Sequence, residues 1–235
     1  MTTTPPFAEL LTRIADRSAA LRAAAAAAPE LTATVPSCPA WSLRDLVVHL
    51  GHVHRFWAQT VAAGPAEKPI SYDEGAAVEG DALAWSAAGT EELLAALRAA
   101  DPEQGCWTWW GYSEVPQTVY SVARHQVQEA AVHAVDAQLA AGLPVELPSA
   151  VALDGIAEFM SLEFTDPWPH APARITLAAA EGPSWQLELG EPGPDAAQVT
   201  FTAPAADLLL TLHRRRPLDG DQPLLAELIA WPVLD

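Results

Sequence analysis

The stretch from Tyr120 to Gly142 constrains the fold of this chain most strongly, because it predicts one helix that carries a stripe of ionisable side chains. It is rich in Ala and Gln, has no Pro or Gly inside it, and runs into Gly-Leu-Pro, a typical helix stop. At 100° per residue, four ionisable side chains fall within an arc roughly 80° wide. They are His125, Glu129, His133 and Asp136. Such a stripe is either solvated or gathered around a cation.

Glu129 and His133 are four residues apart, which sets a carboxylate and an imidazole side by side at a spacing suited to a divalent metal. The pair alone is a weak signal, because Glu and His at this spacing also occur on exposed helices. A metal site therefore needs a third ligand from another part of the chain.

A second helix supplies candidates for the third ligand. Ser42 is an expected N-cap, and Asp45 three residues later forms a box-like start before an apolar run. The apolar arc of this helix contains His49 and His54, whereas His52 falls outside it. An inward imidazole is either a ligand or a core histidine that is hydrogen-bonded to a carbonyl or carboxylate.

The charge of the chain argues against two classes of partner. Its 12 Lys and Arg against 30 Asp and Glu give a net charge of −18, so a basic footprint for nucleic acid or an anionic membrane is not expected. The sequence shows no signal peptide and no long uncharged apolar segment, so we expect a cytoplasmic protein. Two cysteines, Cys38 and Cys106, exclude a disulfide framework and a Cys-rich zinc site.

The first 143 residues predict a four-helix bundle. Two further helices are expected at residues 7–28 and 81–100, with a long loop at 64–80 and a possible break of the third helix at Gly89-Thr90. Facing helices of such a bundle can bring His49 opposite Glu129 and His133.

The chain changes character after Pro144. A helix is expected at 150–164, three short alternating strands at 174–178, 185–189 and 198–202, and a helix at 203–216 that ends in three arginines. Meandering strands with helices indicate a small α+β domain. The predicted fold class is therefore α+β multidomain, with domains at 1–143 and 150–235 and a linker at 143–149.

Three segments together carry a family resemblance: VPSCPAWSLRDLVVHLGHVHR, RHQVQEAAVHAVDAQ and PAADLLLTLHRRRPLDGD. In this order and spacing, the chain resembles the mycothiol-dependent maleylpyruvate isomerase family, which joins a DinB-like metal-binding four-helix bundle to a sterol-carrier-like C-terminal domain. The resemblance implies Zn²⁺ on His49, Glu129 and His133 with an open fourth position, and mycothiol as the thiol. It also puts an arginine near the site, which we take to be Arg215, for catalysis and for cofactor binding.

Four more residues are candidates for supporting roles. Asp136 can orient an imidazole or can be a solvated surface carboxylate. His54 is a candidate for proton handling, or is structural. Trp109 and Trp110 can wall a cofactor pocket or plug the end of the bundle.

The expected function is cis–trans isomerisation of a maleylpyruvate-like acid by thiolate addition and elimination, with zinc or another divalent metal, since His₂Glu sites accept several metals. One alternative is a mycothiol S-transferase that conjugates the thiol to an electrophile. Another is a non-catalytic metal-binding or sensor protein. The expected partners are a small thiol and a small electrophilic or unsaturated acid, with no nucleic acid and no membrane, in a monomer or homodimer.

Overall fold

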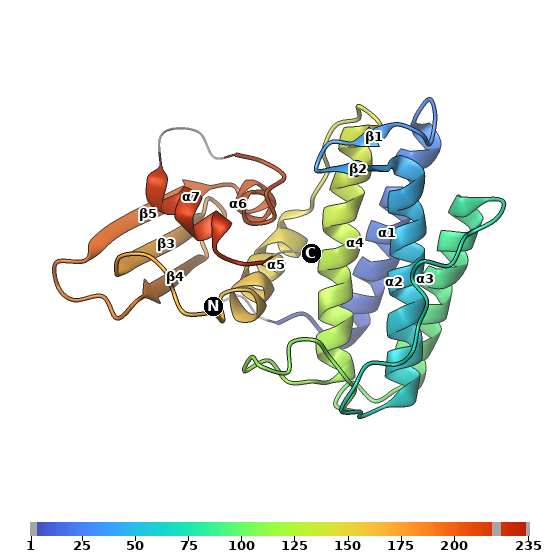
Figure 1. Ribbon diagram of the computed structural model, residues 1–235, viewed down its shortest axis with the longest axis horizontal. Helices are drawn as coiled ribbons and strands as arrows, with labels where there is room; N and C mark the ends of the chain where they lie inside the picture. Colours follow the sequence, from blue (N-terminus) through green and yellow to red (C-terminus); the bar gives the residue numbers. More distant parts are fainter. Residues whose placement is uncertain (1–3, 218–221, 234–235) are drawn as a thin grey trace. The chain divides into compact units, whose positions relative to one another are not determined.

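The computed structural model describes residues 4–217 and 222–233, and its backbone divides into two compact units (Figure 1). One unit spans Pro5–Leu147 and is helical apart from a short hairpin. The other begins at Pro148 and combines a three-stranded sheet with helices. The predicted α+β fold class is confirmed. Within the described ranges, no helix has the length and apolar character needed to cross a bilayer.

Four helices form the first unit, and each packs against two principal neighbours. Helix α1 lies against α3 and α4, and α2 lies against the same two helices. Their bounds are α1 Phe7–Ala27, α2 Leu43–Ala63, α3 Ala82–Ala99 and α4 Val119–Ala140. Helix α2 begins as predicted, because Ser42 accepts a hydrogen bond from the Asp45 amide while the Asp45 carboxylate accepts from the Ser42 amide.

The α2–α3 contact is close because glycines lie where the two helices cross. A Cβ atom on Gly51 would overlap the Trp85 ring, and one on Gly89 would come within 2.8 Å of the Gly51 carbonyl oxygen. The prediction that Gly89-Thr90 could split α3 is wrong. Gly89 lies inside an unbroken helix, where its missing side chain admits the backbone of α2.

A two-stranded hairpin replaces the irregular, Pro-interrupted segment expected before α2. Strands β1 (Thr34–Val35) and β2 (Cys38–Ser42) pair antiparallel, with an irregular register between Thr34 and Val35. Figure 1 shows the hairpin lying across the end of the bundle where α2 begins and α4 ends. Val35 is fully buried in the core cluster of that end, so the hairpin is part of the packed bundle.

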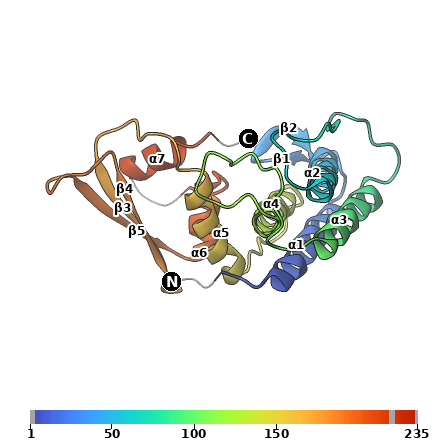
Figure 2. The same ribbon diagram turned by 90° about the horizontal axis from the view of Figure 1, so that it is seen from below.

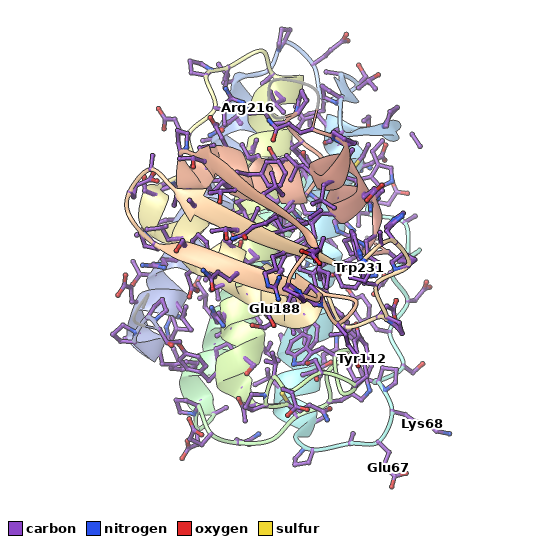
Figure 3. The ribbon with its side chains drawn as sticks, turned by 90° about the vertical axis from the view of Figure 1, so that its left-hand side faces the viewer. Glu67, Lys68, Tyr112, Glu188, Arg216 and Trp231 are labelled. Carbon is purple, nitrogen blue, oxygen red and sulfur yellow. The ribbon has the colours of Figure 1, made fainter. Side chains whose placement is uncertain are left out.

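Two long connections join the helices, and the first of them lies where the long loop at 64–80 was predicted. The 64–81 segment links α2 to α3 and the 100–118 segment links α3 to α4. In Figure 3, Glu67 and Lys68 project from the first of these and Tyr112 from the second. The second connection also carries Trp110, which is fully buried against Trp57.

The second unit is a sheet with strand order β4-β3-β5, in which β3 pairs antiparallel with β4 and parallel with β5. The expected meander is therefore wrong, since a parallel pair needs a crossover connection. The elements are α5 Ser149–Leu162, β3 Ala173–Ala179, β4 Ser184–Leu189, β5 Ala197–Ala203, α6 Ala205–Leu212 and α7 Pro223–Ala230.

Strand β3 shows why one face of this sheet is covered. Its residues alternate between buried and half-buried, and Figure 2 shows α5 and α6 on one side of the sheet. Figure 3 turns the other side toward the viewer, where the labelled Glu188 on β4 pairs with Arg174 on β3 at 3.3 Å.

Helix α6 ends at Leu212, before the arginine run that was expected to belong to it. Arg214 takes a left-handed backbone conformation with φ 61°, and the Arg215 amide turns back to the Leu210 carbonyl at 2.7 Å. This closure is a common helix ending. The Arg214 side chain then donates to the carbonyls of Ile229 and Pro232, which ties the end of α6 to α7 and the residues after it.

Candidate metal centre

The three predicted ligands meet between α2 and α4. His49 Nε2 lies 3.1 Å from Glu129 Oε1, and His133 Nε2 lies 3.3 Å from the same oxygen. One ligand atom from each residue lies within 4.8 Å of the other two. Their side chains keep exposures of 30%, 22% and 10% for His49, Glu129 and His133, so solutes can reach the group.

These distances fit a shared cation. Zinc binds imidazole nitrogen and carboxylate oxygen at about 2.0–2.2 Å in a tetrahedral arrangement, so two of its ligand atoms lie roughly 3.3–3.5 Å apart. The two contacts to Glu129 Oε1, at 3.1 and 3.3 Å, are close to that separation. The donor set of two imidazoles and one carboxylate is typical of sites that keep an open position.

Asp136 supports one of the ligands from behind. It is fully buried, and its Oδ2 lies 2.9 Å from His133 Nδ1. Because this carboxylate accepts the Nδ1 proton, the His133 Nε2 atom is the one that faces Glu129. Carboxylate–histidine pairs of this kind orient metal-binding imidazoles in proteins. Of the two readings of Asp136, the solvated surface carboxylate is therefore wrong.

The electrostatics of the group match its geometry. Burial by itself raises the pKa of the Glu129 carboxyl, but the adjacent His133 charge and the hydrogen bonds from both imidazoles hold it well below its ordinary value. Burial likewise lowers the pKa of His133, but Glu129 and Asp136 outweigh it and raise that pKa to about 10. At neutral pH the pair is thus an imidazolium beside a carboxylate, and a cation that binds there displaces a proton.

The β1–β2 hairpin adds two residues that the sequence reasoning missed. The Trp41 ring lies 4.7 Å from the His49 ring and 6.3 Å from the His133 ring, measured between centroids. Ser37 Oγ donates to Asp136 Oδ1 at 2.5 Å. The available signal was the position of PSCPAWS just ahead of the ligand-bearing helix, but it became meaningful only once the segment was seen to fold back over the bundle.

His54 is not part of the metal group. It is fully buried, and its Nδ1 lies 3.1 Å from Thr90 Oγ1 on α3. Burial lowers its pKa to about 3, with Glu129 acting in the opposite direction. A group that stays neutral at physiological pH and has no exposed surface favours the structural alternative for His54.

An aromatic cluster lies one helical turn or more from the group formed by His49, Glu129 and His133. Its members include Trp109, Trp110 and His125. The His125 ring lies 5.5 Å from the Trp109 ring and 5.2 Å from the Trp110 ring. Trp110 is fully buried, which matches the plugging alternative, whereas Trp109 is half-buried. His125 therefore shares the helical stripe of the ligands but takes part in an aromatic cluster instead.

His52 is buried, contrary to the expectation that it projects away from the packed side of α2. Its side chain contacts Tyr72 Oη at 3.0 Å, the Ala76 carbonyl at 3.2 Å and the Trp85 ring at 4.7 Å. The helical period placed His52 outside the apolar arc of α2. The side of α2 that carries His52 is nevertheless covered, by the 64–81 connection and by α3. His52 thus holds a loop and does not ligate the metal group.

The arginine run lies in the second unit, at the end of α6. Arg214 is held by backbone carbonyls, and Arg216 pairs with Asp207 at 2.5 Å. Arg215 is half-buried and donates to the His213 carbonyl at 2.7 Å. Its role near the metal group stays a prediction.

Comparison with known proteins identifies the family of the first unit. Residues 11–138, more than half of the chain, match the family model of the mycothiol maleylpyruvate isomerase N-terminal domain. The chain belongs to this isomerase family. The matched range contains all three candidate ligands of the family member described here, together with Asp136 and Trp41.

Two solved structures resemble most of the chain. Both are crystal structures of the mycothiol-dependent maleylpyruvate isomerase, one of them of a point mutant. The mutant is 13% identical with a TM-score of 0.67, and the other is 12% identical with a TM-score of 0.65. Each match covers 88% of both chains, so the family fold extends through the second unit. A search of curated proteins gave no match.

Proposed function

We propose that this chain is an enzyme that holds a divalent cation, zinc first among the candidates, on His49, Glu129 and His133. We further propose that it uses mycothiol to isomerise a maleylpyruvate-like acid. The observation that carries the proposal is the convergence of two imidazoles on one carboxylate oxygen, at 3.1 and 3.3 Å. Family membership supports the thiol and the substrate class.

The donor set favours catalysis over a purely structural role. Two neutral imidazoles and one carboxylate leave a divalent cation with a net positive charge and room for a further ligand. When bound, such a cation would lower the pKa of a coordinated thiol and so supply a thiolate, which would add to the cis double bond and, after rotation about the resulting single bond, would be expelled as the trans double bond forms.

The residues of the chain orient this chemistry. Asp136 holds the Nδ1 proton of His133 and thereby directs its Nε2 lone pair toward the cation position. The Trp41 ring packs against the His49 ring, with their centroids 4.7 Å apart. The Glu129 carboxylate stays ionised across the physiological range, since its pKa is held well below its ordinary value.

Substrate binding needs a local positive group, because the net charge of −18 repels a small dianionic acid. Arg214, Arg215 and Arg216 form the basic run after α6, and each donates to a group within the second unit. We propose Arg215 as the guanidinium that binds a carboxylate of the substrate or of the thiol adduct, as a planar bidentate donor.

The test compares the parent protein with Glu129→Ala and, as a matched control, Glu30→Ala, which removes an exposed carboxylate away from the metal group. Metal content is measured by mass spectrometry after purification with Zn²⁺, and helical content by circular dichroism. Glu129→Ala is expected to lower metal occupancy at least tenfold with unchanged helicity, because the bundle has its own apolar core. The control is expected to match the parent.

The activity assay separates the proposed reaction from its alternatives. Parent protein with mycothiol and maleylpyruvate is expected to form the trans isomer, and no product without the thiol. Thioether products with a panel of electrophiles, in place of isomerisation, would favour the S-transferase function. Tight metal binding without either turnover would refute an enzymatic role and favour a sensor.

A further inference from the structure

The β1–β2 hairpin contacts the two histidine ligands by separate routes. Ser37, in the turn between the strands, donates to Asp136, and the other carboxylate oxygen of Asp136 accepts from His133. Trp41, on β2, lies with its ring at 45° to the His49 ring and 4.7 Å from it. One two-stranded element thus reaches ligands on two different helices.

We propose that the β1–β2 hairpin is the positioning element of the metal centre. Ser37 acts on His133 through Asp136, and Trp41 acts on His49 directly. This inference rests on the proposed function, because it assumes that a cation occupies the histidine–glutamate group.

The hairpin is anchored firmly enough for this role. Val35 is fully buried in the same core cluster as Leu46 and Ala134, which come from the two ligand-bearing helices. The backbone of α2 also bonds to the segment before the hairpin, since the Leu43 amide donates to the Ala33 carbonyl and the Arg44 amide donates to the Leu31 carbonyl, both at 2.8 Å. Backbone hydrogen bonds therefore join the base of the hairpin to the start of α2.

These contacts restrict the rotation of the two imidazole rings, which decides whether both can ligate one cation. An imidazole turns about two side-chain torsions, and either rotation moves Nε2 away from a shared cation. The ring of Trp41 blocks rotation of His49 on one side, while the hydrogen bond that His133 Nδ1 donates to Asp136 fixes both the ring angle and the tautomer of His133. Ser37 in turn fixes the Asp136 carboxylate, which is fully buried.

The experiment uses Co²⁺ as a probe on the full-length protein. Apparent Kd is measured by competition with a chelator, and ligand geometry by the visible d–d absorption. Ser37→Ala and Trp41→Leu are each expected to weaken Co²⁺ binding about tenfold or more and to change the absorption, on the scale known for groups that support metal ligands. Two conservative variants retain these supporting contacts, because Ser37→Thr keeps the hydroxyl and Trp41→Phe keeps an aromatic ring. Their Kd for Co²⁺ is expected to stay within about threefold of the parent value.

Matched controls come from the second unit. Ser161→Ala removes a hydroxyl that bonds within α5, and Trp168→Leu removes a half-buried indole that contacts His170 and Trp231. Both are expected to keep the Co²⁺ affinity and spectrum of the parent. If either control variant lost as much Co²⁺ affinity as Ser37→Ala, the effect would come from general destabilisation of the protein, and the proposal would be overturned.

Two further outcomes decide the inference. If Ser37→Ala and Trp41→Leu keep the Kd and spectrum of a metal-binding parent, the hairpin is only a cover and the proposal fails. If Ser37→Ala does not fold, Asp136→Asn tests the same link, since Asn keeps the shape and loses one acceptor, and parent-like Co²⁺ binding in it would overturn the proposal. A parent that binds neither Co²⁺ nor Zn²⁺ instead refutes the proposed function itself.

Discussion

Replacing His54 with leucine should make the free energy of unfolding fall less as the pH is lowered. The pKa of His54 is lowered by burial from 6.5 to about 3, so the unfolded chain takes up a proton there that the folded chain does not. Above about pH 6.5 His54 is neutral in both states and does not lower the free energy of unfolding. As the pH drops from 6.5 toward 3, the unfolded chain binds the proton and the free energy of unfolding falls. At 1.36 kcal/mol per pKa unit, the loss between pH 7 and pH 4.5 is about 2.5 kcal/mol.

Leucine suits this test because it removes the titration and fills the site. Thr90 keeps the hydrogen bond from Arg22 and its own bond to the Ser86 carbonyl when His54 is gone. In the described part of the chain, His54 Nε2 also has no hydrogen-bond partner, so leucine removes a buried unsatisfied group. We therefore expect His54→Leu to equal or exceed the parent in stability at pH 7.

Urea unfolding, followed by circular dichroism at pH 7, 6, 5 and 4.5 with a chelator present, measures the difference. The chelator removes the separate pH dependence of metal binding. The parent should lose about 2.5 kcal/mol more than His54→Leu over this range, through the proton that only its unfolded state binds. Equal losses in the two proteins would refute the buried neutral state of His54.

Three further predictions concern other parts of the chain. Arg215→Lys should lower kcat/KM a hundredfold or more in steady-state assays, which corresponds to about 2–4 kcal/mol of transition-state stabilisation. Arg216→Lys should keep kcat/KM within about threefold of the parent. Equal effects of the two substitutions would show that the three arginines only close the end of α6. Gly51→Ala should destabilise the bundle by about 1–3 kcal/mol in urea unfolding, because the new methyl overlaps the Trp85 ring, and a neutral result would contradict the close α2–α3 contact. Burial raises the pKa of Cys106 to about 11, so its thiol should react with a disulfide reagent at pH 8 far more slowly in the folded than in the urea-unfolded protein.

Local patterns predicted the helices and the Glu129–His133 pair, because both depend on neighbours within a few residues. The Ser42–Asp45 box begins α2, and the spacing of Glu129 and His133 places both on one side of α4. The apolar arc of α2 held two candidate imidazoles, and the family resemblance selected His49 over His54. The capping box, the spacing and the arc need only the helical period and the assumption that apolar sides face inward.

Contacts between distant segments decided the rest. The period of α2 assigned His52 to a side away from one apolar arc, but a loop and α3 bury it there. The period of α4 grouped His125 with the ligands, yet tryptophans from another segment surround it. Asp136 could be solvated or supportive until Ser37 and His133 were seen on either side of it.

The sequence by itself determined the four helices of the first unit and placed Glu129 and His133 on one side of α4, because a helical period and a capping box are properties of consecutive residues. Only the tertiary structure decided that a hairpin with Ser37 and Trp41 lies over those residues, and that β3 and β5 pair in parallel. Side chains that meet across dozens of residues leave no period in the chain, because their proximity is set by how whole elements pack.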